Sequence, residues 1–146
     1  MFAIDTNLLI YAYNTYSEFH KKSSLFLERV LNEYDEEGNP SVCLPLQVLM
    51  EFINVITRQN IKNPLSLNQA VKIVEEYQQS GVRIVYPQET QLSTFLELLK
   101  SVKTRKKVFD VALAATLKDN EISGLYTVNI SDFQDFDFLK VENPLK

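Results

Sequence analysis

The first twelve residues constrain the fold of this chain more than any other stretch of it. Residues 1–4 suit a buried β-strand and run directly into Asp5, Thr6 and Asn7, after which apolar residues take helical spacing. The stretch therefore predicts a strand, a polar elbow and a helix. In an open parallel sheet, ligands bind at the carboxyl ends of the strands. Asp5 is thus placed for chemistry, although Asp5 or Thr6 could instead only cap the following helix.

Length and cysteine content limit the class of protein. A chain of 146 residues is long enough for one domain, and we expect residues 1–146 to form a single domain. Cys43 is the only cysteine, which excludes an internal disulfide and a cysteine-rich zinc site and fits a reducing cytoplasm. No basic, apolar leader opens the sequence and no run of eighteen apolar residues occurs, so we expect a cytoplasmic protein that does not span a membrane.

Glycine and charge exclude further classes. The three glycines stand alone in the sequence, so neither a GxGxxG dinucleotide turn nor a GxxxxGK[ST] phosphate loop is present. The net charge of −4 argues against broad affinity for nucleic acid. Positive charge is concentrated in one segment, however, because five of the fifteen basic residues lie between Lys100 and Lys107.

Strand-like and helix-like segments alternate along the rest of the chain, which predicts an α/β fold with a parallel sheet. We expect helices from Ser17 to Tyr34, from Pro45, from Ser66, over about 88–102 and from Phe109, and strands over 42–44, 82–86, 125–128 and near the chain's end. The spacing directs Tyr34, Leu92 and Leu96 inward. The early helices carry more apolar residues than one inward stripe needs, namely Leu8, Leu9, Ile10, Tyr11, Tyr13, Phe52, Ile53, Val55 and Ile56, which predicts that another chain covers them.

Three further acids occupy positions comparable to that of Asp5. Glu51 lies beside the apolar stripe of its helix, Asp110 lies in the first turn of an almost wholly apolar helix, and Asp132 follows a strand. The positive end of the helix dipole should lower the pKa of Asp110. Each acid alone could be a cap or a solvated side chain.

A cluster of these four acids would need a cation. Two carboxylates about 4 Å apart repel by roughly 4 kcal/mol at an effective dielectric near 20. Mg²⁺ or Mn²⁺ fits best, because these ions prefer oxygen ligands and the chain has neither a second histidine nor a second cysteine for zinc. Carboxylate-bound magnesium commonly serves phosphoryl chemistry.

Four motifs together resemble the PIN-domain ribonucleases, and within them the VapC-type toxins of toxin–antitoxin pairs. The motifs are Ile-Asp-Thr-Asn at the start, Gln-Val-Leu-Met-Glu-Phe around Glu51, Phe-Asp-Val-Ala-Leu-Ala-Ala-Thr around Asp110, and Tyr-Thr-Val-Asn-Ile-Ser-Asp-Phe around Asp132. They occur in the family's order and extend from residue 4 to residue 133. The resemblance implies a PIN-like three-layer sandwich, with a parallel sheet of four or five strands flanked by helices.

The resemblance also implies a site and an activity. Asp5, Glu51, Asp110 and Asp132 take the catalytic and metal-binding positions, and Thr6, Asn7, Thr127 and Asn129 take supporting polar positions. The implied activity is Mg²⁺- or Mn²⁺-dependent endonucleolytic cleavage of RNA to 5′-phosphate and 3′-hydroxyl ends. Asp5 and Asp110 would bind the principal metal ion, and Glu51 and Asp132 would complete the site. The implied partners are a cognate antitoxin and a second copy of the chain.

Other interpretations remain open at this point. A haloacid-dehalogenase-like phosphatase would also use a strand-end aspartate, but its signature requires a second acid where this chain has Asn7. A PIN-like fold without catalysis could act as an RNA-binding module, and all four acids could be caps or solvated residues. The basic run, with Lys103, Arg105, Lys106 and Lys107, either binds the RNA backbone or is a solvated loop.

Overall fold

Strand β1 lies at the centre of the sheet. The computed structural model describes residues 1–103, 105 and 107–146. Its five strands are β1 (Phe2–Ile4), β2 (Val42–Pro45), β3 (Arg83–Val85), β4 (Gly124–Tyr126) and β5 (Lys140–Glu142). They form one sheet in the order β3-β2-β1-β4-β5, and every neighbouring pair is parallel. The predicted α/β fold with a parallel sheet is confirmed.

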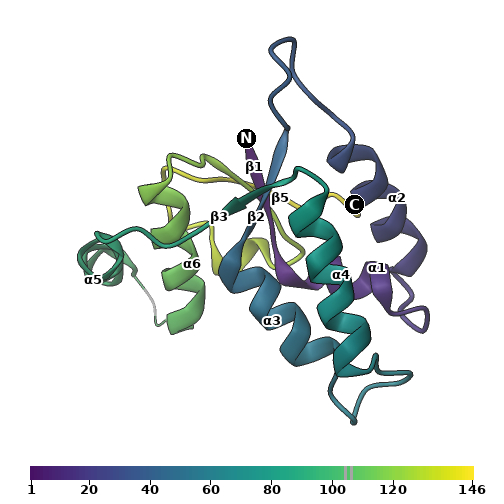
Figure 1. Cartoon of the computed structure of the whole chain (residues 1–146). Helices are drawn as coiled ribbons and strands as arrows, with labels where there is room; N and C mark the ends of the chain where they lie inside the picture. Colours follow the sequence, from purple (N-terminus) through teal and green to yellow (C-terminus); the bar gives the residue numbers. More distant parts are fainter. Residues whose placement is uncertain (104, 106) are drawn as a thin grey trace.

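The handedness of the crossovers assigns the helices to two faces of the sheet. The helices are α1 (Thr6–Tyr13), α2 (His20–Leu31), α3 (Leu46–Ile56), α4 (Leu67–Gln79), α5 (Gln91–Ser101) and α6 (Val108–Asp119). The chain moves outward from β1 through β2 to β3, so right-handed connections place α1–α4 on one face. The connection from β3 back to β4 runs in the opposite direction, which places α5 and α6 on the other face (Figure 1).

The direction of the connections reverses between β1 and β4. The chain leaves β1 toward β2 on one side, and it leaves β4 toward β5 on the other side. Connecting segments diverge at such a switch point and leave a crevice at the carboxyl ends of the two strands. Asp5 directly follows β1, and the segment with Asn129 and Asp132 follows β4. The topology alone therefore brings the first and last predicted acids to the same crevice.

The early helices bury many of their apolar residues within this chain. Helix α1 packs against both α2 and α3. Leu8, Leu9 and Ile10 of α1 are buried, as are Phe52 and Ile56 of α3. For these five residues the prediction that another chain covers them is wrong, because α1 packs against two helices rather than one. The other four, Tyr11, Tyr13, Ile53 and Val55, are only partly buried, and for them it stays a prediction.

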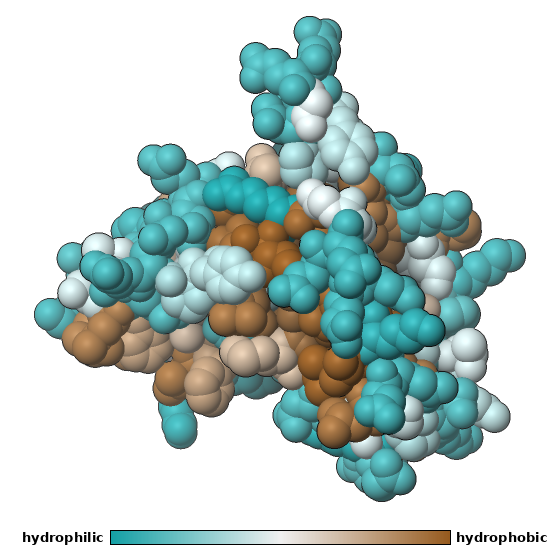
Figure 2. Space-filling model, in the orientation of Figure 1, coloured by the Kyte–Doolittle hydropathy of each residue, from teal (hydrophilic) through white to brown (hydrophobic). Residues whose placement is uncertain are grey.

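Several residues that we expected to face inward are exposed. Tyr34 lies in a projecting hydrophilic loop, where it forms an antiparallel bridge with Pro40 (Figures 1 and 2). Leu92 and Leu96 are exposed on α5, because α5 packs chiefly on α6 and buries little beyond Leu98. Helical spacing correctly identified an apolar face on α5, but it did not identify what covers that face.

Within the described residues, no helix is both long enough and apolar enough to cross a lipid bilayer.

Gly124 is required by the close approach of β1 and β4. A Cβ atom at this position would lie 2.4 Å from the Phe2 ring, which also contacts Tyr126. Gly124→Ala should therefore lower the free energy of unfolding by about 1–3 kcal/mol, as overpacking does. Urea denaturation measures the change, with Ser123→Ala on the exposed neighbour as the control. Equal unfolding free energies for Gly124→Ala and the control would contradict this packing.

Candidate active site

The four predicted acids line one cavity of about 740 Å³ at the carboxyl edge of the sheet. Asp5 follows β1, Glu51 lies on α3, Asp110 lies on α6, and Asp132 ends the short 3-10 helix Ile130–Asp132. They come from four separate elements and from positions up to 127 residues apart in sequence. Four independent caps or solvated residues would have no reason to share a cavity.

The two carboxylate oxygens of Asp5 have different roles. Oδ1 accepts a hydrogen bond of 2.8 Å from the backbone N–H of Thr6, so Asp5 does cap α1. Oδ2 accepts a bond of 2.7 Å from the Thr127 hydroxyl, which itself accepts a bond of 3.0 Å from the Asn129 N–H. Thr127 is fully buried behind Asp5. The loop after β4 thus fixes the orientation of the carboxylate at the end of β1.

Burial raises the pKa of Asp5, and this effect is larger than any other on the group. The hydrogen bonds from Thr127 and Thr6 lower the pKa, whereas the carboxylates of Glu51 and Asp132 raise it. Glu51 is also fixed, because its Oε2 accepts a bond of 3.1 Å from the buried Thr6 hydroxyl. Thr6 therefore contacts two of the four acids, one through its N–H and one through its hydroxyl.

Asp110 does not cap α6. Lys107 is the N-cap residue, no side chain caps this helix end, and Asp110 lies one turn further along the chain. The pKa of Asp110 is raised to about 6, chiefly by burial and also by the carboxylates of Asp132, Asp5 and Glu51, while Lys107 lowers it. The prediction that the helix dipole would lower this pKa is wrong, because desolvation and neighbouring carboxylates outweigh the dipole.

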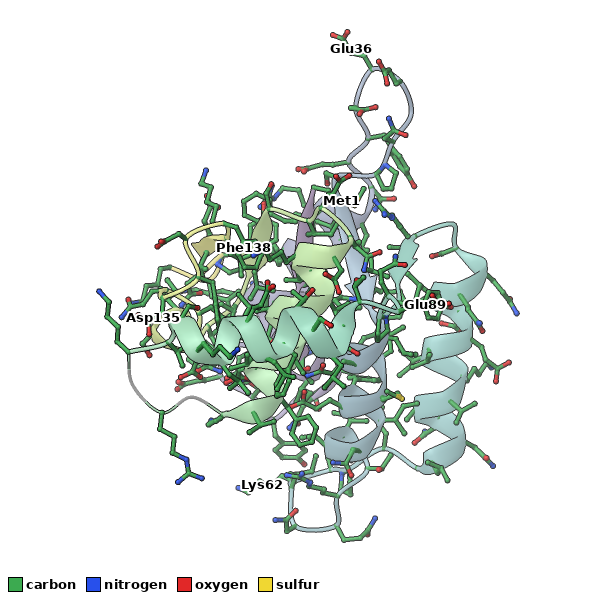
Figure 3. The ribbon with its side chains drawn as sticks, turned by 90° about the vertical axis from the view of Figure 1, so that its left-hand side faces the viewer. Met1, Glu36, Lys62, Glu89, Asp135 and Phe138 are labelled. Carbon is green, nitrogen blue, oxygen red and sulfur yellow. The ribbon has the colours of Figure 1, made fainter. Side chains whose placement is uncertain are left out.

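The predicted supporting polar residues and the predicted RNA-binding basic residues do not all lie at the acid cavity. Thr6, Asn7, Asn129 and Lys107 line the acid cavity. Lys103 instead lines a separate cavity of about 490 Å³ beside Asp135 and Phe138 (Figure 3). Arg105 is exposed, and Lys106 lies outside the described residues. A role for the basic run in RNA binding stays a prediction.

Sequence reasoning missed one wall of the cavity. Gln47, Asn54 and Arg58 line it together with Glu51. The spacing of i, i+4 and i+7 places Gln47, Glu51 and Asn54 on one side of α3, opposite the buried stripe with Val48 and Phe52, and Arg58 follows beyond the end of the helix. Gln47 also donates a bond of 2.7 Å from Nε2 to the carbonyl of Phe109, which ties α3 to the start of α6. The polar side of an otherwise apolar helix was the available signal.

The donor set fits a hard divalent cation. All four acids offer oxygen, and their mutual repulsion, which adds to burial in raising the pKa of Asp110, favours a cation between them. Among the described residues, no group of three or more His, Cys, Asp or Glu side chains is placed so that it could hold a metal ion by itself. A bound ion would therefore also keep water ligands, as Mg²⁺ usually does in proteins.

Comparison with known proteins identifies the class to which this parallel sheet, with four acids at its switch point, belongs. The family model of the PIN domain matches residues 2–139. The chain therefore belongs to the PIN-domain family. Ribonuclease VapC24 of Mycobacterium tuberculosis is similar over 146 residues at 27% identity, which covers 99% of this chain and 97% of that protein.

Solved structures share the fold over almost the whole chain. VapC20 of Mycobacterium tuberculosis, a toxin that cleaves the sarcin–ricin loop, superposes with a TM-score of 0.70 at 17% identity and covers 98% of this chain and 100% of its own. The FitAcB structure from Neisseria gonorrhoeae has a TM-score of 0.68 at 16% identity, with 99% and 98% covered. At these identities the likeness establishes the three-layer PIN fold.

The raised pKa of Asp110 predicts a pH dependence of stability in the metal-free protein. The folded state holds this proton up to about pH 6, whereas the unfolded state releases it near 3.8. Stability should therefore fall as pH rises through this window, because the folded state binds more protons than the unfolded state. Asp110→Asn should show a smaller fall, since only the raised pKa of Asp5 still contributes to it. Thermal melts in chelator from about pH 3 to pH 7 measure the difference between the two proteins.

Asp35 provides a control, because its contribution to stability should change with pH in the opposite direction. The Asn39 backbone N–H and other hydrogen bonds lower the pKa of this exposed carboxylate. Its contribution should therefore be present above about pH 4 and disappear as pH falls, and Asp35→Asn should remove it. If the stabilities of wild type and Asp110→Asn changed in parallel across pH 4–7, the raised pKa of Asp110 would be refuted.

Proposed function

We propose that this protein is a divalent-metal-dependent endoribonuclease, the toxin of a toxin–antitoxin pair, that works in the cytoplasm as the single domain 1–146. The observation that carries the proposal is the meeting of Asp5, Glu51, Asp110 and Asp132 in one cavity. Membership of the PIN-domain family and the similarity to ribonuclease VapC24 support RNA as the substrate.

Each acid has a proposed role. Asp5 and Asp110 hold the principal Mg²⁺ or Mn²⁺ ion, and Glu51 and Asp132 complete the site through water or a second ion. A bound ion would activate water and offset the charge that develops on a phosphodiester during in-line attack. Glu51 and Asp132 orient the attacking water, and the products are 5′-phosphate and 3′-hydroxyl ends.

The remaining residues keep the acids in place. Thr127 and the Thr6 N–H hold the two oxygens of Asp5, and the Thr6 hydroxyl holds Glu51. Because these hydrogen bonds fix the carboxylates before substrate arrives, little reorganisation is needed during the reaction. Asn7 and Asn129 line the cavity beside them and offer amide groups to the substrate.

Two alternatives are less well supported. A haloacid-dehalogenase-like phosphatase would need an acid where this chain has Asn7, and the family match is to the PIN domain. An inactive RNA-binding module would have no use for four mutually repelling carboxylates, because each resists ionisation of the others at a cost in stability.

Loss of single acids should separate catalysis from stability. Asp5→Asn and Asp110→Asn should each abolish cleavage of RNA in Mg²⁺ or Mn²⁺. In chelator, Asp110→Asn should be at least as stable as wild type, since a repelled carboxylate is removed. Gel assays of RNA cleavage and thermal melts provide the two measurements.

Asp137→Asn is the matched control, because Asp137 lines the second cavity and not the acid cavity. This variant should cleave RNA as wild type does. A destabilised but fully active Asp110→Asn would refute the assignment of Asp110.

An antitoxin is the first proposed partner. Structural neighbours include a toxin–antitoxin complex from Klebsiella pneumoniae and VapBC-1 of nontypeable Haemophilus influenzae, with TM-scores of 0.65 and 0.66. These complexes support the proposal that a cognate antitoxin also binds this chain and restrains its nuclease.

A second copy of the chain is the other proposed partner. Figure 2 shows apolar side chains gathered over the part of the molecule where α5 and α6 lie. Leu92, Leu96, Val108 and Phe109 are all exposed there, and Phe109 is 75% exposed. A contiguous apolar surface of this kind is unusual on a monomer, so we propose a two-fold dimer through α5 and α6.

Light scattering at micromolar concentration tests the dimer. The wild-type protein should have twice the chain mass of 16.9 kDa. Leu92→Asp should shift the protein toward the monomer mass, because the carboxylate would be buried without a partner. Leu25→Asp, on the exposed surface of α2, should leave the mass unchanged. A monomeric wild-type protein would refute the dimer.

A further inference from the structure

The acid cavity contains a positive charge to which the proposed chemistry gives no role. Arg58 directly follows Thr57, the C-cap residue of α3, and lines the cavity. Its side chain is exposed, and the loop with Lys62 follows it (Figure 3). Among the described residues, Arg58 forms no ion pair with a carboxylate. Its guanidinium is therefore available to a ligand in the cavity.

An anionic substrate needs cations in this cavity. Four carboxylates line it, and an RNA strand adds a negative charge at every phosphate. Lys107 is the other basic residue that lines the cavity among those described, and it already acts on Asp110, since it lowers the pKa of that acid. Arg58 follows the carboxyl end of α3, the helix that forms one wall of the cavity. The cavity thus has one cation near the acids and one away from them.

The position of Arg58 relative to α3 determines which part of a substrate it can reach. Glu51 lies in the middle of α3, whereas Arg58 lies two residues beyond Ile56, the last residue of the helix. Asn54 lies between them and also lines the cavity. A phosphate that reacts at the acid site and a phosphate bound by Arg58 are therefore different groups, connected by a strand that follows the wall of the cavity formed by α3 and the residues after it.

We propose that Arg58 is a substrate-positioning residue that binds a backbone phosphate of single-stranded RNA adjacent to the phosphate that is cleaved. A guanidinium suits this role, because its planar fork can donate two hydrogen bonds to one phosphate. Asn54 offers a hydrogen-bonding group to the strand between the two phosphates. This inference rests on the proposed nuclease function and extends it from the reacting phosphate to the path of the strand.

Binding experiments test Arg58 without cleavage. A fluorescein-labelled RNA of about 12 nucleotides is titrated with the Asp5→Asn protein in Mg²⁺, and fluorescence anisotropy gives the Kd. The same titration is repeated with Arg58→Gln added to that protein, and with Arg83→Gln added as the matched control. Arg83 begins β3, at the amino edge of the sheet opposite the cavity, so the control removes the same charge from a distant position.

Arg58→Gln should weaken binding by roughly two- to fivefold, the effect of one exposed charged contact. It should also reduce the slope of log Kd against log salt by about 0.7 between about 50 and 200 mM salt, because one phosphate contact is lost. Arg83→Gln should change neither quantity beyond a small effect of net charge. Arg58→Lys, which retains the charge, should keep the salt slope and recover part of the affinity.

Cleavage kinetics separate this inference from the proposed function. In the otherwise wild-type protein, Arg58→Gln should raise KM and leave kcat within about twofold, because uniform binding is removed. An unchanged KM and salt slope in a protein that cleaves RNA would overturn the role of Arg58 alone. A lower melting temperature with an unchanged salt slope would assign Arg58 a structural role and overturn it as well. If wild type cleaved no RNA, the proposed function would fail, while a reduced salt slope would still support Arg58 as a phosphate contact.

Discussion

Mutual repulsion among four carboxylates is the constraint that the rest of this structure has to meet. Asp5, Glu51, Asp110 and Asp132 line one cavity, and the pKa of Asp110 rises to about 6 as burial and the other three acids act on it. A fold that gathers these groups loses stability unless a cation joins them. The hydrogen bonds from Thr127 and Thr6 hold Asp5 and Glu51 in place despite this repulsion. The same bonds therefore keep these carboxylates in position for a metal ion.

The parallel sheet meets this constraint through its topology. Strands β1 and β4 are neighbours, but their connections leave in opposite directions, so the ends of both strands open into one crevice. Helices α3 and α6 then contribute Glu51 and Asp110 from opposite faces of the sheet, and the Gln47 bond to the Phe109 carbonyl connects these two helices. Arg58, just beyond the carboxyl end of α3, also lines the cavity and extends it from the acids toward a path for a longer anionic ligand.

Sequence reasoning succeeded where a short stretch determines the outcome and failed where the outcome depends on distant neighbours. Asp5 could be placed because the strand, the elbow and the helix are encoded within twelve residues. The pKa of Asp110 was predicted in the wrong direction, since it depends on carboxylates from three other segments. Leu92 was expected to be buried because helical spacing defines an apolar face without its neighbours. Arg58 was missed because an arginine just after a helix resembles an ordinary solvated side chain until the cavity beside it is known.

Direct titration of a metal ion tests the central claim that the four acids form one cation site. Isothermal titration calorimetry of the wild-type protein with Mn²⁺ should show saturable binding near neutral pH. Asp132→Asn should weaken that binding, since removal of one carboxylate lowers the attraction for the ion, while Asp137→Asn should bind as wild type does. Absence of saturable binding, or equal affinity in wild type and Asp132→Asn, would contradict a shared metal site.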